Sequence, residues 1–122
     1  MPKLTLIRGL PGSGKSTMAR KIVASTCAKH YEADSFFMES GAYRFDPAKL
    51  PKAHEWCQRM TLYALKEGYD VVVANTFTRR WEMQPYMEMG FPVEVIVARG
   101  NWPNVHGVPA EAIKRMRARW ED

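Results

Sequence analysis

The sequence predicts an α/β fold in three layers, in which a parallel sheet carries helices on both faces. Short apolar runs, such as DVVVAN at residues 70–75, alternate with longer segments in which apolar residues recur at helical spacing. No linker, repeat or low-complexity stretch interrupts this alternation, and 122 residues are enough for one ordinary domain. Because alternating strands and helices form parallel sheets, we expect a single domain over residues 1–122.

The elements of the first third follow from short patterns. Residues 4–7 (LTLI) form an apolar run that ends at a glycine turn, as a buried strand does. Residues 15–28 are typical of a helix, with inward positions at Met18, Ile22 and Val23. Residues 30–33 (HYEA) are assigned to a strand mainly because they lie between this helix and Asp34. Residues 35–50 contain Gly41, Pro47 and mixed aromatic residues, which indicates a functional loop with at most a short helix.

The remaining elements complete the alternation. Residues 52–68 have helical spacing and end at Gly68, with apolar positions at Ala53, Trp56, Cys57, Met60, Tyr63 and Ala64. After the strand at 70–75, Thr78 is expected to cap a helix to about Met89, which Pro85 should kink or shorten. Residues 93–98 form the fourth strand. Pro109 and Glu111 begin a last helix to about residue 121, whose stripe of Ile113, Met116 and Trp120 is expected to pack on the sheet.

The segment GLPGSGKST, residues 9–17, matches the phosphate-binding pattern G-x-x-x-x-G-K-[ST]. Its glycines let backbone N–H groups converge on phosphate oxygens, and the following helix adds its dipole. A chance glycine turn is disfavoured, because strand, loop, Lys-Ser and helix occur in the required order. The sequence therefore predicts a P-loop NTPase fold with strand order 2-3-1-4, binding ATP or another NTP through Gly9, Pro11, Gly12, Ser13, Gly14, Lys15, Ser16 and Thr17.

Two side chains of this loop have expected chemical roles. Lys15 would neutralise charge on the β and γ phosphates, and the hydroxyl of Ser16 would bind Mg²⁺. Right-handed crossovers place the carboxyl ends of all four strands along one edge of the sheet, where ligands bind. We therefore expect the remaining catalytic groups to lie along this edge.

A carboxylate is expected at this edge, because hydrolytic P-loop enzymes hold Mg²⁺ with an acid at the end of a second buried strand. Asp70 precedes VVVA and lies at the wrong end of that strand, and the expected position has Ala74-Asn75-Thr76. Asp34 follows the second strand and is well placed to act on an attacking hydroxyl, and also as a metal ligand. Spacing alone fits a cap of the following turn equally well, but the P-loop favours a catalytic Asp34.

Composition sets broader limits. The chain has 18 Lys and Arg against 13 Asp and Glu, a formal charge of +5, which suits a polyanionic ligand but also an ordinary basic protein. Cys27 and Cys57 are expected to be buried, reduced thiols, and no signal sequence is evident, so we expect a cytoplasmic protein. No apolar run approaches the roughly 20 residues that span a membrane.

Five segments in order resemble the polynucleotide kinase-like group of P-loop proteins, which includes phage polynucleotide 5′-hydroxyl kinases. They are RGLPGSGKST, EADSFF, GAYRFDPAKLPKAHEWC, VVVANTFTRRWEMQPY and NVHGVPAEAIKRM. The resemblance implies that Asp34 acts as a base toward a 5′-hydroxyl and that the acceptor side is lined by Asn75, Thr76 and the turn from Thr78 to Trp81. It also implies that residues 81–86 (WEMQPY) pack beside the site.

The sequence departs from this group in two places. Ala74 stands where members often have an acid, and only Arg99 to Pro103 precede Asn104, where members carry a longer lid that supplies arginines. A kinase needs positive charge beside the γ phosphate. The available substitutes are Arg99, Arg79 and Arg80.

Tyr43 and Arg44, in the loop before the second helix, have two open interpretations: they contact a base and a phosphate, or they cover the end of the core. Our hypothesis is an ATP- and Mg²⁺-dependent kinase acting on a hydroxyl, most simply the 5′-hydroxyl of a nucleic acid. One alternative is a kinase of a small molecule such as a nucleoside, nucleotide or sugar. Another is a weak ATPase or nucleotide-binding switch that acts through a protein partner.

Overall fold

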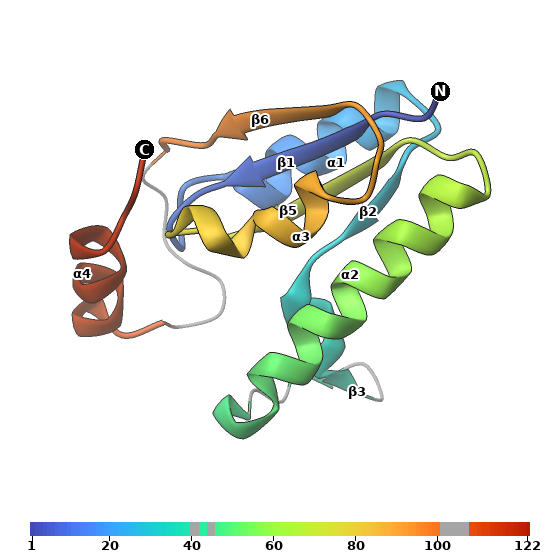
Figure 1. The fold of residues 1–122 in the computed structure, drawn as a ribbon. Coiled ribbons are helices and arrows are strands. Elements are labelled where there is room, and N and C mark those ends of the chain that lie inside the picture. The colour runs from blue at the N-terminus through green and yellow to red at the C-terminus, as the bar shows by residue number, and fades with distance from the viewer. Residues whose placement is uncertain (40–41, 44–45, 101–107) are drawn as a thin grey trace.

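The computed structural model describes residues 1–39, 42–43, 46–100 and 108–122. Four strands form a parallel sheet in the order β2-β5-β1-β6 (Figure 1). These strands are β1 (Leu4–Arg8), β2 (Lys29–Tyr31), β5 (Val71–Asn75) and β6 (Val93–Val97). The order is 2-3-1-4 along the chain, so the expected P-loop NTPase fold is confirmed.

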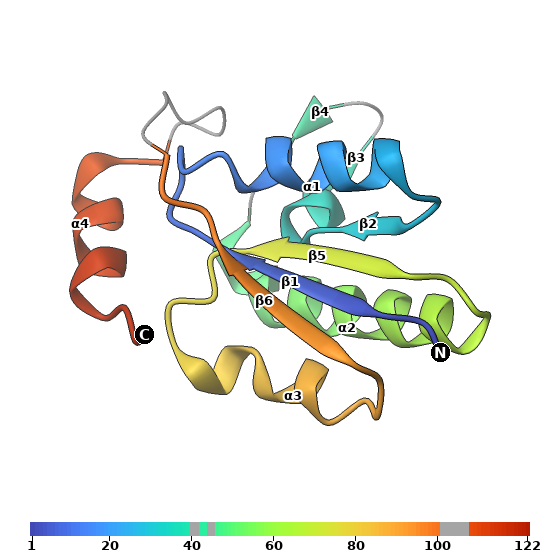
Figure 2. The same cartoon turned by 90° about the horizontal axis from the view of Figure 1, so that it is seen from above.

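Helices cover both faces of this sheet. Figure 2 shows α1 (Lys15–Ser25) on one side and α2 (Leu50–Lys66) with α3 (Gln84–Met87) on the other. Helix α4 (Ala110–Ala118) lies beyond the carboxyl ends of the strands. Short 3₁₀ turns and a small hairpin complete the described elements: η1 (Ala33–Phe37), β3 (Met38–Glu39), β4 (Ala42–Tyr43), η2 (Pro47–Lys49) and η3 (Arg80–Glu82).

Side chains alternate between the two faces of the sheet along each strand, so the apolar residues form two cores, one on each face. Leu4 and Leu6 of β1 face α2 and α3, together with Val71 and Val73 of β5. Ile7 faces α1, where it joins a second cluster that also contains Val72, Ala74, Ala19 and Ala28. The register pairs Arg8 with Asn75 and with Val97, so these three residues lie level at the carboxyl edge.

The helix expected from Thr78 to Met89 is divided into η3 and α3. Pro85 lies in the first turn of α3, where the missing proline N–H is tolerated, so the expected interruption is confirmed. The helix expected over 15–28 ends at Ser25. Gly68 has a φ of 95° just after α2, as expected for a glycine that closes a helix.

Several burial predictions were wrong. Cys27 is exposed and only Cys57 is buried, because α1 ends before Cys27. Tyr63 is 65% exposed, since the inward face of α2 continues through Ala64 and Leu65 instead. Trp81 is 71% exposed, whereas Met83 and Tyr86 of the same segment are buried as expected.

The prediction that α4 packs on the sheet was also wrong. Ile113 and Met116 of the helix, and Trp120 just after it, are only partly buried, and none of the three belongs to either apolar cluster. The ring of Trp120 instead stacks on the guanidinium of Arg8, with Cζ 4.4 Å from the ring centroid. Among the residues described, no helix is long and apolar enough to cross a membrane.

Candidate active site at the carboxyl edge of the sheet

The P-loop connects β1 to α1 at the carboxyl edge and is tightly packed. A Cβ added to Gly9 would lie 2.1 Å from Ser13 Oγ, which no side chain allows. Gly14 caps α1 with a φ of 87°, a conformation that favours glycine. The N–H of Gly9 donates to the carbonyl of Thr76 at 3.3 Å and joins the loop to the segment that follows β5. Gly9 is therefore required by the close approach of the Ser13 side chain, and Gly14 by its backbone conformation.

Lys15 lies in a partly buried position beside two carboxylates. Burial lowers the pKa of Lys15, while the negative charges of Glu32 and Asp34 act in the opposite direction. Desolvation weakens the hydration of the ammonium group, which strengthens its attraction for a phosphate. The structure thus brings the P-loop lysine and the predicted Asp34 to the same edge.

Glu32 is a site residue that the sequence analysis missed. The hydroxyl of Ser16 donates to Glu32 Oε1 at 2.8 Å, and His30 Nε2 lies 2.7 Å from Glu32 Oε2. Burial alone would raise the pKa of Glu32, but the hydrogen bonds from His30 and Ser16 and the charges of His30 and Lys15 lower it. Its acidic type, at the end of the second strand and two residues before Asp34, was the signal available in the sequence.

Asp34 lies in η1, which is tied to the sheet by Asn75. The Oδ1 atom of Asn75 accepts the N–H of Ala33 at 2.8 Å, and its Nδ2 lies 3.8 Å from Cys57 Sγ. Asn75 is buried, so its side chain holds the Asp34 segment against the end of β5. This contact explains why an amide follows the buried VVVA run, but it does not test the predicted contact of Asn75 with an acceptor.

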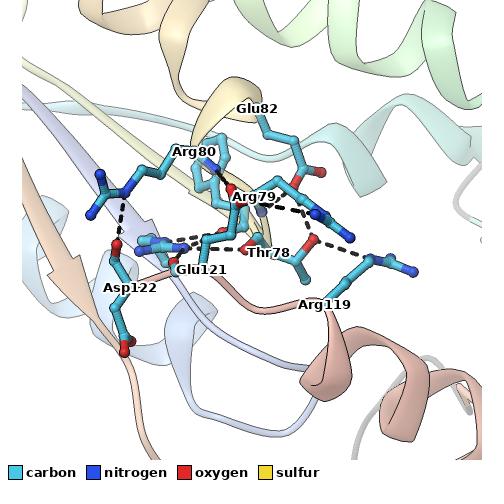
Figure 3. Close-up of polar contacts among 9 residues, drawn as sticks. Thr78, Arg79, Arg80, Glu82, Arg119, Glu121 and Asp122 are labelled. Atoms are coloured by element: carbon cyan, nitrogen blue, oxygen red, sulfur yellow. Dashed lines mark hydrogen bonds and ion pairs between the residues drawn. The ribbon is translucent and has the colours of Figure 1, made fainter.

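The turn after β5, predicted to line the acceptor side, forms a polar network (Figure 3). The hydroxyl of Thr78, which is buried, donates to Glu82 at 3.0 Å and accepts from Arg119 Nε at 3.2 Å. The N–H of Arg79 also donates to Glu82, at 2.7 Å. Thr76 is nearby, since its carbonyl accepts the N–H of Gly9.

The last two residues of the chain bind the same turn. Glu121 Oε1 accepts the N–H of Arg80 at 2.8 Å, and its Oε2 lies 3.7 Å from the guanidinium of Arg79 (Figure 3). Arg80 Nε donates to the carbonyl oxygen of Asp122 at 2.7 Å. The predicted site residues Arg79 and Arg80 are thus held by carboxylate and carbonyl oxygens of the C-terminal segment.

Arg8, the residue before the P-loop motif, binds the backbone of the turn after β5. It is buried, and its Nε and Nη2 atoms donate to the carbonyl of Phe77 at 3.0 and 2.8 Å. Its Nη2 also donates to the carbonyl of Glu121. Phe77 has a φ of 47°, a left-handed conformation that a non-glycine residue adopts only when its surroundings hold it. Arg8 therefore fixes the turn after β5 relative to β1.

Arg99 lies beside the P-loop rather than in this network. The N–H of Ala98 donates to the carbonyl of Arg8 at 2.7 Å, and the N–H of Gly100 donates to the carbonyl of Ser13 at 2.9 Å. These two bonds flank Arg99 and hold its backbone against the loop, while its side chain is exposed. Arg44 and the segment 101–107 lie outside the described residues, as does the side chain of Tyr43.

The donor groups at the edge fit a nucleotide with Mg²⁺. No group of three or more His, Cys, Asp or Glu residues that could hold a metal occurs in the part of the chain that the structure describes. Mg²⁺ does not need one, because it binds through one or two protein oxygens together with phosphate oxygens and water. The hydroxyl of Ser16 and the carboxylate of Glu32 are oxygen groups of this kind and lie together at the P-loop.

Comparison with known proteins places the chain among P-loop proteins. A family model described as an AAA domain matches residues 4–102. NEDD4-binding protein 2 of Homo sapiens is 33% identical over 132 residues, which cover 93% of this chain. The chain spans only 7% of that relative's length. An uncharacterised protein of Pasteurella multocida is 28% identical and is matched over 95% of this chain and 75% of its own length.

Solved structures with a similar fold include a sugar kinase and an APS kinase. A sugar kinase from Janibacter sp. HTCC2649 has a TM-score of 0.61 at 21% identity, covering 100% of this chain and 69% of its own. A chain of the Pnkp1/Rnl/Hen1 complex has a TM-score of 0.67 at 22% identity, covering 93% of this chain and 38% of its own. The APS kinase CysC of Mycobacterium tuberculosis, in complex with AMPPNP and APS, has a TM-score of 0.61 at 18% identity, covering 93% of this chain and 67% of its own. At these identities the likeness concerns the fold.

Proposed function

Because the chain belongs to the AAA domain family and shares its fold with P-loop kinases, we propose that it transfers the γ-phosphoryl group of ATP, or another NTP, to a hydroxyl group. The proposal rests on the positions of four side chains at one edge of the sheet. Lys15 and Ser16 of the P-loop lie beside the carboxylates of Glu32 and Asp34. A phosphate site beside a partly buried carboxylate is what transfer to a hydroxyl requires. Bound Mg²⁺ would neutralise part of the triphosphate charge.

The roles follow from the positions of these groups. Backbone N–H groups of the P-loop and Lys15 bind the phosphates, and Ser16 provides a hydroxyl oxygen to the metal. Asp34 accepts the proton of the acceptor hydroxyl as its oxygen attacks the γ phosphorus. The bond from that phosphorus to the β–γ bridging oxygen breaks, and ADP leaves with the electron pair.

Arg99 is the arginine we assign to the γ phosphate. Its neighbours Ala98 and Gly100 are both hydrogen-bonded to residues at the P-loop, and its side chain is exposed. The other two candidates are engaged in the turn network, Arg79 by Glu121 and Arg80 by Asp122. The assignment therefore prefers Arg99, with Arg79 and Arg80 acting on the acceptor side.

For the acceptor we propose the 5′-hydroxyl of a polynucleotide. Three arginines with exposed side chains, Arg79, Arg80 and Arg119, gather at the turn after β5, on the same sheet edge as Asp34. Such a cluster suits the phosphodiesters that follow a 5′ end. The resemblance of five segments to polynucleotide kinases points the same way, as does the structural likeness to a chain of the Pnkp1/Rnl/Hen1 RNA repair complex.

A small-molecule acceptor is the second candidate. Its support is the sugar kinase from Janibacter sp. HTCC2649, which matches this chain from end to end. The two candidate acceptors differ in whether they would contact the cluster of Arg79, Arg80 and Arg119. Phosphodiesters of a nucleic acid would use the cluster, whereas a small neutral hydroxyl compound would not.

The experiment is transfer from γ-labelled ATP to a panel of acceptors: DNA and RNA with 5′-hydroxyl ends, nucleosides, and sugars. We expect label on the 5′-hydroxyl oligonucleotides with the wild type, and a loss of about 100-fold or more with Asp34→Asn, the scale of general base catalysis. Label on sugars or nucleosides alone would establish the second candidate. Label on no acceptor, with ATP still bound, would contradict a kinase and favour a nucleotide-binding switch.

A further inference from the structure

The carboxyl end of β5 lacks the acid that P-loop enzymes place there. In its place stand Ala74, which is buried in the core facing α1, and Asn75, whose side chain binds Ala33 and Cys57. Asp70 lies at the opposite end of β5, where its carboxylate accepts the N–H of Lys3 at 2.8 Å. Neither Asn75 nor Asp70 can therefore serve as the carboxylate of a metal site.

Glu32 lies level with the missing acid, one strand away. Strand β2 pairs with β5 in parallel, and the last register pair is Tyr31 with Val73. Glu32 is the next residue after Tyr31, and Ala74 is the next after Val73, so the two occupy the same level of the sheet. The carboxylate reaches the P-loop from there, since its Oε1 atom accepts the hydroxyl of Ser16 at 2.8 Å.

We propose that Glu32 replaces the absent β5 acid in the magnesium site, acting through Ser16. A serine hydroxyl has one proton to donate and two lone pairs. Donation of that proton to Glu32 turns the lone pairs of Ser16 toward a cation, and the negative carboxylate makes the oxygen a stronger ligand. Glu32 is thus a positioning residue, and the inference rests on nucleotide binding by the P-loop but not on the identity of the acceptor.

His30 fixes the orientation of this carboxylate. Its Nε2 atom lies 2.7 Å from Oε2, so both oxygens of Glu32 have partners, Ser16 on one side and His30 on the other. The side chain of Glu32 is only 13% exposed, which limits the other conformations that it can adopt. A carboxylate held at both oxygens keeps the Ser16 hydroxyl in one orientation before the metal arrives.

The charge of Glu32 gives the proposal a distinctive signature. Without metal, a buried carboxylate beside Lys15 repels the phosphates of a nucleotide. With metal, the same charge balances the cation. Loss of this charge should therefore weaken only the Mg²⁺-dependent part of nucleotide binding, and metal-free binding should stay the same or become tighter. A variant with a damaged fold would instead weaken both.

The experiment measures ADP binding by titration calorimetry, in EDTA and over a series of MgCl₂ concentrations. Glu32→Gln should raise the Mg²⁺ concentration for half-maximal enhancement by about 10–100-fold, the usual effect of losing such an outer partner of a metal ligand. The matched control is Glu94→Gln, which removes an exposed carboxylate 3.4 Å from Lys3 and should leave the Mg²⁺ dependence unchanged. An unchanged Mg²⁺ dependence in Glu32→Gln would overturn the proposal.

A double-mutant cycle tests the path through Ser16. In a Ser16→Ala background, Glu32→Gln should have no further effect on the Mg²⁺ dependence, because its target hydroxyl is already gone. A full additional effect would show that Glu32 acts on the metal by another route and would overturn the proposal. If Glu32→Gln does not fold, His30→Ala replaces it, and an unchanged Mg²⁺ dependence in that folded variant would count against the proposal. Neither measurement needs an acceptor, so a failure of the proposed kinase activity would remain separate.

Discussion

Individual side chains at the sheet edge differ in how firmly their neighbours hold them. Glu32 has a hydrogen-bond partner at each oxygen, and Thr78 is bound by both Glu82 and Arg119. Arg99 is exposed, although its backbone is fixed at the P-loop. The side chains of Glu32 and Thr78 are thus fixed in advance by their hydrogen bonds, whereas the arginine that we assign to the γ phosphate has an exposed side chain.

This difference leads to a prediction about Arg99 and Arg79. Arg99→Ala should lower kcat by about 100-fold or more, the cost of removing one group that stabilises transition-state charge. Arg79→Ala should leave kcat nearly unchanged and raise KM for an oligonucleotide acceptor, because Arg79 lies in the acceptor turn. Steady-state kinetics with ATP and a 5′-hydroxyl oligonucleotide separates the two effects. A large loss of kcat in Arg79→Ala alone would reverse our assignment.

At the residue scale, the sequence identified the P-loop side chains but not their supporting partners. Lys15 and Ser16 follow from a local motif whose spacing is set by backbone geometry. Arg8 acquires its role from contacts with segments distant in sequence, such as Phe77, and a single sequence contains no direct signal for it. For Glu32 the sequence offered its acidic type at the end of the second strand, but not its contact with Ser16. The exposure of Cys27 was missed for a related reason, since it depends on where α1 ends.

Among the elements, the segment that follows α4 differs most from what the sequence predicted. Trp120 stacks on Arg8, the N–H of Glu121 donates to the carbonyl of Thr78 at 2.7 Å, and the Glu121 carboxylate binds Arg80. The segment therefore closes over the turn between β5 and η3. The sequence showed the apolar stripe that ends at Trp120. It did not show that Trp120 contacts the buried side chain of Arg8.

Substitution of Arg8 tests this arrangement. Arg8→Met keeps much of the side-chain volume but leaves the carbonyls of Phe77 and Thr78 without their charged donor. We expect a loss of about 1.5–3 kcal/mol in the free energy of unfolding, the range for hydrogen bonds to a charged group, measured by urea denaturation. Trypsin should also cut more readily after Arg79 in this variant, because the turn is no longer fixed.

The control for Arg8→Met is Glu121→Gln, whose free energy of unfolding is measured in the same way. Its partner Arg79 is about half exposed, and exposed ion pairs contribute little, so we expect a loss of about 1 kcal/mol or less. Equal losses in the two variants would contradict the central position that we give to Arg8 in this network.

At the scale of the whole molecule, the sheet topology explains why scattered residues meet. Parallel strands place the ends of β1, β2, β5 and β6 along one edge, which gathers the P-loop, Glu32 and Asp34, the Thr78–Arg80 turn, and Arg99. This part of the fold could be predicted, because apolar runs and crossover handedness determine it. The placement of α4 and the partners of the turn could not, because they depend on which side chains occupy the edge.

A kinase of the kind proposed here transfers the γ-phosphoryl group to a hydroxyl and not to water. The most direct measurement is the rate of ADP formation with Mg²⁺ and ATP, with and without a 5′-hydroxyl oligonucleotide, alongside the amount of phosphorylated 5′ ends. We expect the oligonucleotide to accelerate ADP formation, and ADP and phosphorylated ends to appear in equal amounts. ADP formed at the same rate without the oligonucleotide, with no phosphorylated ends, would contradict this expectation.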